Sequence, residues 1–304
     1  MATERPPSID PTAARRYAEL PAAGSAWLHE EVGRRMAERL QWIKLQPARW
    51  ADWGPVRGGL VAHAAVTQRY PKAECFVVES IGEHIRLARR ALRKPWWDRS
   101  PWATPAPRFE APTDVSLQMV WANMALHMAA DPQSLVTQWH RALAPDGFLM
   151  FSCFGPDTLL ELRALYQAQG WPPPSHEFTD MHDWGDMLVN AGFAEPVMDM
   201  ERITLSFATP QRLLEELRGL GRNLHAARFP ALRGRHWHAD LLRALATLQP
   251  SQEPPGGLTV TFEIIYGHAF RPAPRVSIQS ETVLSLDEMR RELRRGKAAS
   301  GSRT

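Results

Sequence analysis

The sequence predicts an α/β protein built on a mostly parallel sheet with helices on both faces. Between residues 49 and 154, short apolar runs alternate with segments whose apolar residues recur every three or four positions, which is the pattern of strands and amphipathic helices. The run 74–79 is continuously apolar between two acids, as expected for a parallel strand covered on both faces. A glycine-rich turn follows the first strand, at a place where such sheets bind ligands.

The first half of the chain supplies most of the predicted sheet. A helix is expected at about 25–44, because its apolar residues form one stripe. In Ser80–Glu83 the serine and the glutamate have the spacing of a capping box, which predicts the start of a helix. The other elements expected here are strands at 49–53, 117–123 and 148–154 and helices at 59–69 and 133–143. Residues 94–113 are rich in proline and tryptophan and predict an irregular loop, with at most a short strand near Phe109.

The second half is organised differently. A helix is expected after Pro156, another at 180–191 capped by Gly192, and a third opened by Thr209 and Pro210. A strand near 197–206 and a helix near 238–248 complete this part. Residues 258–264 alternate strictly between apolar and polar types, which predicts a half-exposed antiparallel strand.

Composition limits the classes of protein that the chain can be. Its 304 residues are 44% hydrophobic, and 36 Lys and Arg against 33 Asp and Glu give a net charge of +3. So mild an excess does not by itself indicate a nucleic-acid partner, although an arginine-rich surface suits an acidic one. No apolar run approaches the ~20 residues that cross a bilayer, and the first residues lack a signal peptide's apolar core. We therefore expect a cytoplasmic protein that binds neither membrane nor nucleic acid.

Residues 52–59 and the acid at 79 form the best candidate ligand site. Where a strand turns into its helix, Gly54 and Gly58 would let a nucleotide-like ligand approach the backbone, and the helix N-terminus would add unpaired N–H groups. Glu79 follows Gly58 by about 20 residues, where an acid can accept hydrogen bonds from ribose hydroxyls. The glycine spacing does not match a dinucleotide motif. A tight turn beside a surface acid remains the simpler alternative.

Other reactive residue types give weaker signals. Asn123 ends a predicted strand, so it either contacts a ligand or caps the turn. Cys75 and Cys153 lie in apolar runs, which predicts buried thiols rather than a disulfide or a metal site. The histidines lack any metal-ligand spacing, and no serine lies in a nucleophile elbow. No metal site and no serine hydrolase are therefore expected.

Longer motifs resemble the malonyl-acyl-carrier-protein O-methyltransferases of biotin synthesis, which are class I methyltransferases. The most specific is FSCFGPDTLLELR at 151–163. The other matching stretches are DPTAARRYAEL (10–20), EEVGRRMAERL (30–40), VWANMALHMAADPQSLVTQWHRALAPDGFLM (120–150), FTDMHDWGDMLVNAGFAEPVMDMERITL (178–205), LRGLGRNLHAARF (217–229) and TFEIIYGHAF (261–270). The resemblance covers roughly residues 10–270.

The resemblance implies a Rossmann-like fold with a seven-stranded sheet, one strand of it antiparallel, and a helical insertion in the C-terminal half. It implies one domain at 12–285, with a cofactor half at 45–155 and a substrate half at 156–275. Residues 1–11 are expected to be disordered and 286–304 to form a basic tail.

The implied activity is transfer of a methyl group from S-adenosylmethionine to the free carboxylate of malonyl-acyl carrier protein. Residues that match the family's cofactor site are Asp52, Gly54, Gly58, Glu79 and Asn123. Candidates for the malonyl carboxylate are Tyr17, Tyr266 and His268, each of which could equally serve packing. The arginines near 212–235 are expected to meet the acidic carrier protein.

The glycine loop departs from the family pattern. Pro55 and Val56 stand where the family has Cys and Gly, and the Val56 side chain is expected to intrude on the cofactor. Glu79 and Gln118 each stand where the family usually has Asp, and the acidic segment at 109–114, including Glu110, is shortened. These departures leave two hypotheses open: an active methyltransferase, or a non-catalytic homologue that binds acyl carrier protein or a partner enzyme.

Overall fold

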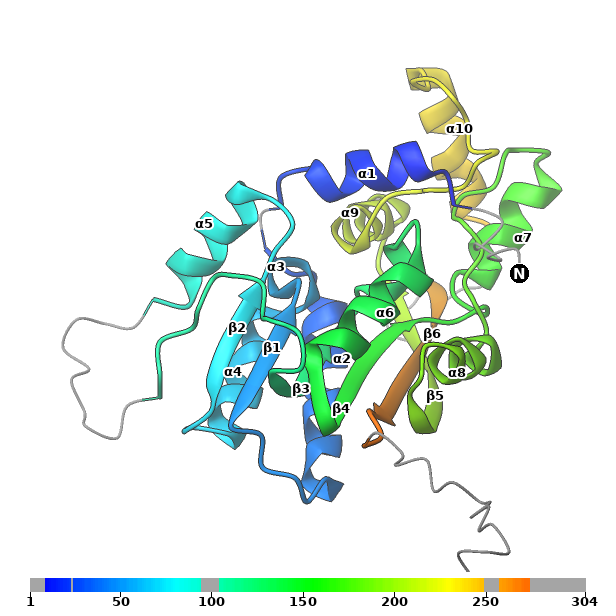
Figure 1. Ribbon diagram of the computed structural model, residues 1–304. Helices are drawn as coiled ribbons and strands as arrows, with labels where there is room; N and C mark the ends of the chain where they lie inside the picture. Colours follow the sequence, from blue (N-terminus) through cyan, green and yellow to red (C-terminus); the bar gives the residue numbers. More distant parts are fainter. Residues whose placement is uncertain (1–8, 23, 94–103, 249–256, 274–304) are drawn as a thin grey trace, which may run out of the picture. The chain divides into compact units, whose positions relative to one another are not determined.

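The centre of the molecule is a sheet of six strands (Figure 1). The computed structural model describes residues 9–22, 24–93, 104–248 and 257–273, and those up to Pro272 belong to one compact unit. The strands are β1 (Arg49–Trp53), β2 (Glu74–Val78), β3 (Leu117–Ala122), β4 (Leu143–Phe154), β5 (Ala194–Phe207) and β6 (Leu258–Phe270). Their order is β2-β1-β3-β4-β6-β5, and β6 runs antiparallel to the other five strands.

This architecture confirms the predicted α/β class, but not the predicted number of strands. The stretch near Phe109 contributes only an isolated parallel bridge between Arg108 and Phe76. Prolines at 105, 107 and 112 lack the N–H group that a ladder requires, so the pairing cannot extend. The described sheet therefore has six strands rather than seven.

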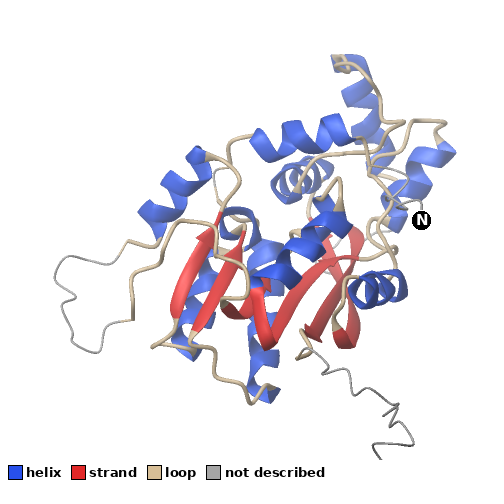
Figure 2. Ribbon diagram, viewed as in Figure 1, coloured by secondary structure: helices blue, strands red, loops and turns tan. Residues whose placement is uncertain are grey.

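The helices form two layers on the sheet and a group beyond its end (Figure 2). They are α1 (Pro11–Glu19), α2 (Trp27–Arg39), α3 (Pro55–Gly58), α4 (Leu60–Arg69), α5 (Gly82–Ala91), α6 (Pro132–Ala142), α7 (Leu160–Ala168), α8 (Met181–Asn190), α9 (Pro210–Leu220) and α10 (Arg235–Leu245), with 3-10 turns η1 (Leu40–Trp42) and η2 (Leu126–Met128). In Figure 1, α1 and α9 lie beyond the ends toward which β1 and β2 point. No described helix is both long and apolar enough to span a membrane.

The side chains of successive strand residues point to opposite faces of the sheet, so the hydrophobic core has two parts, one on each face. Trp50 and Trp121 pack in a cluster with residues of α2 and α4. The intervening residues Ala51 and Val120 pack with residues of α6 and α8. Because successive strand residues point to opposite faces, each parallel strand must be apolar on both. This explains the continuous apolar runs in the sequence.

Several local predictions are confirmed and others are wrong. The Thr209 side chain accepts the N–H of Arg212 with Pro210 in the first turn, and Gly192 follows α8 at a φ of 97°. In contrast, α5 begins at Gly82 with no side-chain cap, so Ser80 does not form the predicted capping box. The strand at 258–264 is antiparallel, as predicted, but it is less exposed than expected. Thr259 and Thr261 are only partly exposed and Glu263 is buried, because the turn after β4 and the start of α7 pack on this face.

Candidate functional site

The turn after β1 brings the two predicted halves of the site together. Gly54 has a φ of 75°, a left-handed conformation that favours glycine, and its N–H donates to the Val78 carbonyl at 2.9 Å. The N–H of Val56 donates to Oε1 of Glu79 at 2.8 Å. The predicted turn and the predicted acid are therefore in direct contact.

The Val56 side chain does not intrude on the site, which corrects the expectation drawn from the family pattern. It is fully buried and belongs to the core cluster that includes Val32 and Met36. The short helix α3 turns its side chain toward α2 and leaves its N–H for Glu79. The residue that replaces the family's glycine therefore stabilises the core without occupying the ligand side.

A cavity of about 240 Å³, here called the loop cavity, lies beside this turn. It collects four of the residues predicted from the sequence: Tyr17, Gly54, Glu79 and Asn123. Its lining consists of Ala14, Tyr17, Ala18, His29, Gly54, Arg57, Glu79, Ser80, His84, Asn123, Met124, Ala125, Met128, Ala129 and Leu135. The predicted residues Asp52 and Gly58 are not in this lining.

Asp52 and Gly58 have structural roles behind the loop cavity. The Asp52 carboxylate is buried with its Oδ2 2.8 Å from Nδ1 of His63, and burial raises the pKa of Asp52. A Cβ atom on Gly58 would lie 2.5 Å from the Asn123 carbonyl oxygen. The close approach of the residue that follows β3 thus requires glycine at position 58.

Asn123 connects three elements around the loop cavity. Its Nδ2 donates to the carbonyl oxygens of His29 (2.7 Å) and Gly58, and its Oδ1 accepts from the Ser152 hydroxyl at 2.6 Å. With the amide engaged at both ends, its main effect is to position α2 and the glycine turn. Of the two alternatives from the sequence, contact or cap, the hydrogen bonds favour a structural role.

Glu79 is the buried acid of the loop cavity. Its side chain is 3% exposed, and burial raises its pKa to about 7. Its Oε2 lies 3.4 Å from Nδ1 of His84, whose Nε2 donates to the Leu20 carbonyl at 3.1 Å. Burial lowers the pKa of His84, so the pair favours holding one proton between its two facing atoms.

Arg57 and His29 add charge and hydrogen-bonding capacity that sequence reasoning missed. The Arg57 guanidinium stacks on the Tyr17 ring at 3.8 Å and donates to the carbonyls of Tyr17 and Leu20, both at 2.7 Å. Among the described acids none forms an ion pair with it. Nδ1 of His29 donates to the Arg57 carbonyl at 2.8 Å, whereas its buried Nε2 has no partner. The signals in the sequence were a histidine among the apolar residues of α2 and an arginine within the glycine turn.

A second cavity of about 250 Å³ lies next to the first and is here called the apolar cavity. Met128 lines both cavities. At Gly221, which also lines the apolar cavity, an added Cβ would lie 3.8 Å from the Tyr17 hydroxyl. The boundary between the cavities is therefore formed by Met128 and Tyr17. Most of the remaining wall is apolar, with Arg218 and Arg222 among its few charged residues.

Tyr266 and His268 lie away from both cavities, within the described part of the chain. The Tyr266 hydroxyl donates to Glu201, and the Arg39 guanidinium covers its ring at 3.7 Å. His268 packs between Phe148 and Phe270. These contacts fit the packing alternative for both residues. Of the three substrate candidates, Tyr17 is the one that lines either of these two cavities.

The other departures from the family pattern have local partners. Oε1 of Gln118 accepts the N–H of Arg49 at 2.8 Å, which fastens β3 to β1. Glu110 is exposed, 3.6 Å from Arg108, and is not part of the loop cavity's lining. Within the described ranges, no cluster of His, Cys, Asp and Glu could hold a metal ion. Both cysteines are buried and free, as predicted.

Known proteins with similar sequences match this chain over most of its residues. The chain is 38% identical over 288 residues to the malonyl-[acyl-carrier protein] O-methyltransferase of Gallionella capsiferriformans, covering 91% of this chain and 96% of that protein. It is 36% identical to the enzyme of the same name from Laribacter hongkongensis, covering 83% and 85%. No protein-family model matches the chain.

Solved structures share the fold at low sequence identity. The YcgJ protein of Bacillus subtilis superimposes with a TM-score of 0.54 at 13% identity, covering 79% of this chain and 99% of that one. A candidate methyltransferase from Bacillus halodurans gives a TM-score of 0.52 at 16% identity, covering 79% and 100%. These likenesses agree with the α/β class.

Proposed function

The chain belongs to the malonyl-[acyl-carrier protein] O-methyltransferase family, and we propose that it transfers a methyl group from S-adenosylmethionine to the free carboxylate of malonyl-acyl carrier protein. The observation that carries the proposal is the adjacency of two cavities with different linings. The loop cavity contains a buried acid and a cation, whereas the apolar cavity contains mostly hydrocarbon. They meet at Met128, so two ligands could react at that boundary.

The lining of the loop cavity fits S-adenosylmethionine. Glu79 offers a buried carboxylate to ribose hydroxyls, and Arg57 offers an unpaired guanidinium to the carboxylate of the methionine part. Nε2 of His29 carries a lone pair for the ammonium group: Nδ1 holds the ring proton, and burial lowers the pKa of this imidazole to about 4. When bound, S-adenosylmethionine supplies an electrophilic methyl group on a sulfonium centre.

The chain's own residues then need only to align the acceptor and exclude water. A malonyl carboxylate is ionised at pH 7, because such acids titrate near about 4, so no general base is required. In such a transfer one carboxylate oxygen would bond to the methyl carbon, and the electron pair of the broken carbon–sulfur bond would stay on sulfur. Tyr17 and Met128 stand at the boundary where this alignment must occur.

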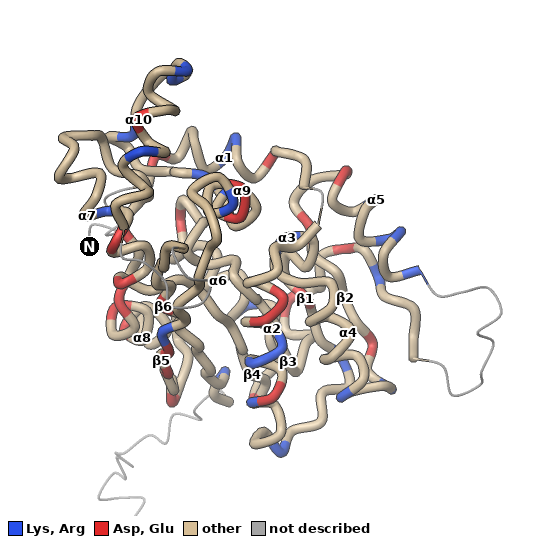
Figure 3. Tube along the Cα trace, turned by 180° about the vertical axis from the view of Figure 1, so that it is seen from behind, with Lys and Arg blue, Asp and Glu red and all other residues tan. Residues whose placement is uncertain are grey.

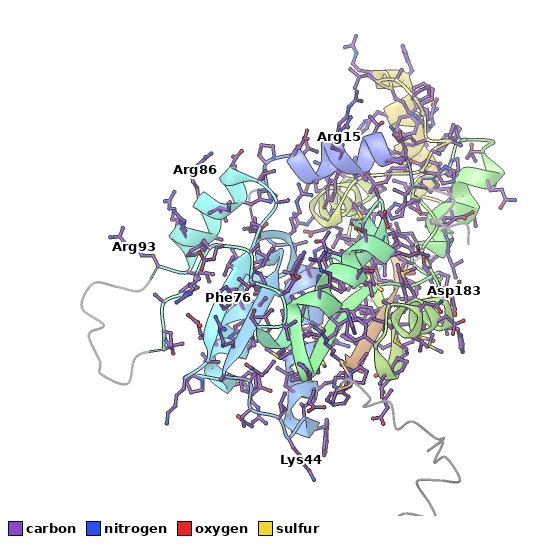
Figure 4. The ribbon with its side chains drawn as sticks, in the orientation of Figure 1. Arg15, Lys44, Phe76, Arg86, Arg93 and Asp183 are labelled. Carbon is purple, nitrogen blue, oxygen red and sulfur yellow. The ribbon has the colours of Figure 1, made fainter. Side chains whose placement is uncertain are left out.

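Exposed arginines on the helices that line the two cavities suit an acidic carrier protein. Arg15 on α1 and Arg218 and Arg222 at the end of α9 have no ion-pair partner among the described residues. Figure 3 shows basic segments on α9 and α10, and Figure 4 shows Arg15 projecting away from the body of the protein. Attraction between such a surface and an acidic partner accelerates association.

One feature favours the alternative of a non-catalytic homologue. The Glu30 carboxylate accepts hydrogen bonds from the N–H groups of Val61 and Ala62. These N–H groups at the N-terminus of α4 therefore already have a partner in the protein. That helix end is where a ligand's anionic group would otherwise bind. On this alternative the protein would bind the carrier protein but not the cofactor.

Two measurements separate the proposals. Saturating S-adenosylhomocysteine, at ~100 times its dissociation constant, should stabilise the fold by about 2.7 kcal/mol. Incubation with S-adenosylmethionine and malonyl-acyl carrier protein should add one methyl group, seen by mass spectrometry, and acetyl-acyl carrier protein is the control because it lacks the free carboxylate. Absence of both effects at millimolar cofactor would favour the non-catalytic homologue. Growth without biotin of cells lacking their own enzyme tests the physiological role.

A further inference from the structure

A third cavity extends the apolar cavity away from the cofactor side. This outer cavity, of about 300 Å³, includes Trp171 and His225 in its lining. It shares Tyr166, Pro174, Ser175 and His176 with the apolar cavity. The outer, apolar and loop cavities thus follow one another, joined first by this shared wall and then by Met128. Such a row could take a long, thin ligand.

Two buried polar atoms in the shared wall have no partner. Ser175 is 8% exposed and His176 is 2% exposed, and neither the Ser175 hydroxyl nor Nδ1 of His176 makes a hydrogen bond to any described residue. Leaving a polar atom buried and unpaired costs roughly 1–3 kcal/mol. Two such atoms on consecutive residues beside a cavity point to a ligand that would satisfy both.

The hydrogen-bonding state of His176 is determined by its other nitrogen. Nε2 lies 2.9 Å from the His127 carbonyl oxygen, which can only accept, so Nε2 carries the ring proton. Burial lowers the pKa of His176 to about 4, so the ring is neutral at pH 7. Nδ1 is therefore an acceptor, and it would repel rather than bind a carboxylate or a phosphate.

The pair consists of one acceptor, Nδ1 of His176, next to one hydroxyl that can donate, that of Ser175. This pattern is complementary to a secondary amide, whose N–H donates and whose carbonyl accepts. We propose that Ser175 and His176 bind an amide group of the pantetheine arm on which a carrier protein presents its thioester. The inference rests on the proposed function, since it assigns a position to the arm of that substrate.

The remaining wall agrees with an arm of this chemistry. Its polar residues Thr158 and Asn223 are already engaged: the Thr158 hydroxyl with the Glu263 backbone, and the Asn223 amide with Pro173 and His225. The other neighbours are mainly apolar, which suits the hydrocarbon of the arm. Within the lining of the apolar cavity, Ser175 and His176 thus carry the buried polar atoms that lack a partner among the described residues, and they fix where an amide would lie.

Comparison of two small substrates tests the proposal. Malonyl-pantetheine carries amides, whereas S-ethyl malonyl thioester carries none. Ser175→Ala should raise KM for malonyl-pantetheine about 3- to 10-fold, the range of one hydrogen bond, and leave KM for the ethyl thioester unchanged. His176→Gln, which retains a donor for the His127 carbonyl but displaces the acceptor, should give the same split. Leu217→Ala, an apolar change in the same wall, should affect both substrates alike.

Equal changes of KM for the two substrates, or no change for either, would overturn the proposal and leave the pair a structural feature. If neither thioester is methylated, the proposed function fails separately. The amide site is then tested by calorimetry with S-acetylpantetheine, which should bind the wild-type protein and bind Ser175→Ala about 3- to 10-fold more weakly. Absence of binding to the wild-type protein at millimolar concentration would refute the site itself.

Discussion

Replacing Glu79 by glutamine should make the protein more stable at alkaline pH. The folded state holds the proton of Glu79 up to a pKa of about 7, whereas the unfolded chain releases it near the usual value of 4.5. Stability from this group is therefore present at low pH and is lost as pH rises through 7. Because one pKa unit corresponds to about 1.4 kcal/mol, the full loss is about 3 kcal/mol.

Glutamine removes this loss while retaining the local hydrogen bonds. Its oxygen can still accept the Val56 N–H, and its amide can donate to the bare Nδ1 of His84. In urea titrations, the free energy of unfolding of Glu79→Gln relative to wild type should increase by about 2 kcal/mol between pH 5.5 and pH 8.5. The exposed acid Glu110, changed to glutamine, is the matched control and should show no such increase.

A constant or decreasing difference would refute this reasoning. It would mean that Glu79 is ionised in the folded state and paired with a protonated His84. The same titration bears on the ligand, since an ionised carboxylate accepts stronger hydrogen bonds from ribose hydroxyls. Affinity of the wild-type protein for S-adenosylhomocysteine should accordingly rise as pH increases through 7.

Three further changes test other parts of the structure. Gly58→Ala should lower the free energy of unfolding by about 1–3 kcal/mol, because its Cβ would meet the Asn123 carbonyl; unchanged stability in urea would contradict that contact. Val56→Gly should cost about 2–4 kcal/mol through the cavity it leaves in the core, and tighter binding of S-adenosylhomocysteine by calorimetry would show that the side chain faces the ligand instead. Burial lowers the pKa of both His29 and His176 to about 4. Each neutral ring should therefore add up to about 3 kcal/mol to the free energy of unfolding above pH 6.5, and this stability should be lost as pH falls toward 4. Between pH 6.5 and 4, the free energy of unfolding measured in urea should fall less steeply for His176→Gln than for wild type.

The sequence predicted the elements whose signals are local. The strand at 74–79 and the cap at Thr209 depend on residue types within a few positions, and both appear as expected. The contact of the glycine turn with Glu79 was also predictable, because parallel strands end at one edge of a sheet.

Tertiary contacts determined the side-chain directions and the site residues that the sequence did not predict. The side-chain direction of Val56 depends on how α3 packs against α2, which no local pattern encodes. Tyr266 and His268 were chosen by residue type from one motif, yet β6 directs them to Glu201 and to two phenylalanines. Arg57 and His29 were missed because their partners are carbonyl groups far away in the sequence.

The attachment of α1 to the glycine turn has a consequence for handling the protein. This helix contributes Ala14, Tyr17 and Ala18 to the loop cavity. The Arg57 guanidinium holds the C-terminal end of the helix by donating to the carbonyls of Tyr17 and Leu20. Helix α1 is therefore a wall of the loop cavity and not an appendage of the fold. A truncation that removes α1, or an affinity tag that displaces it, would change the shape of the loop cavity as directly as a substitution in the glycine turn.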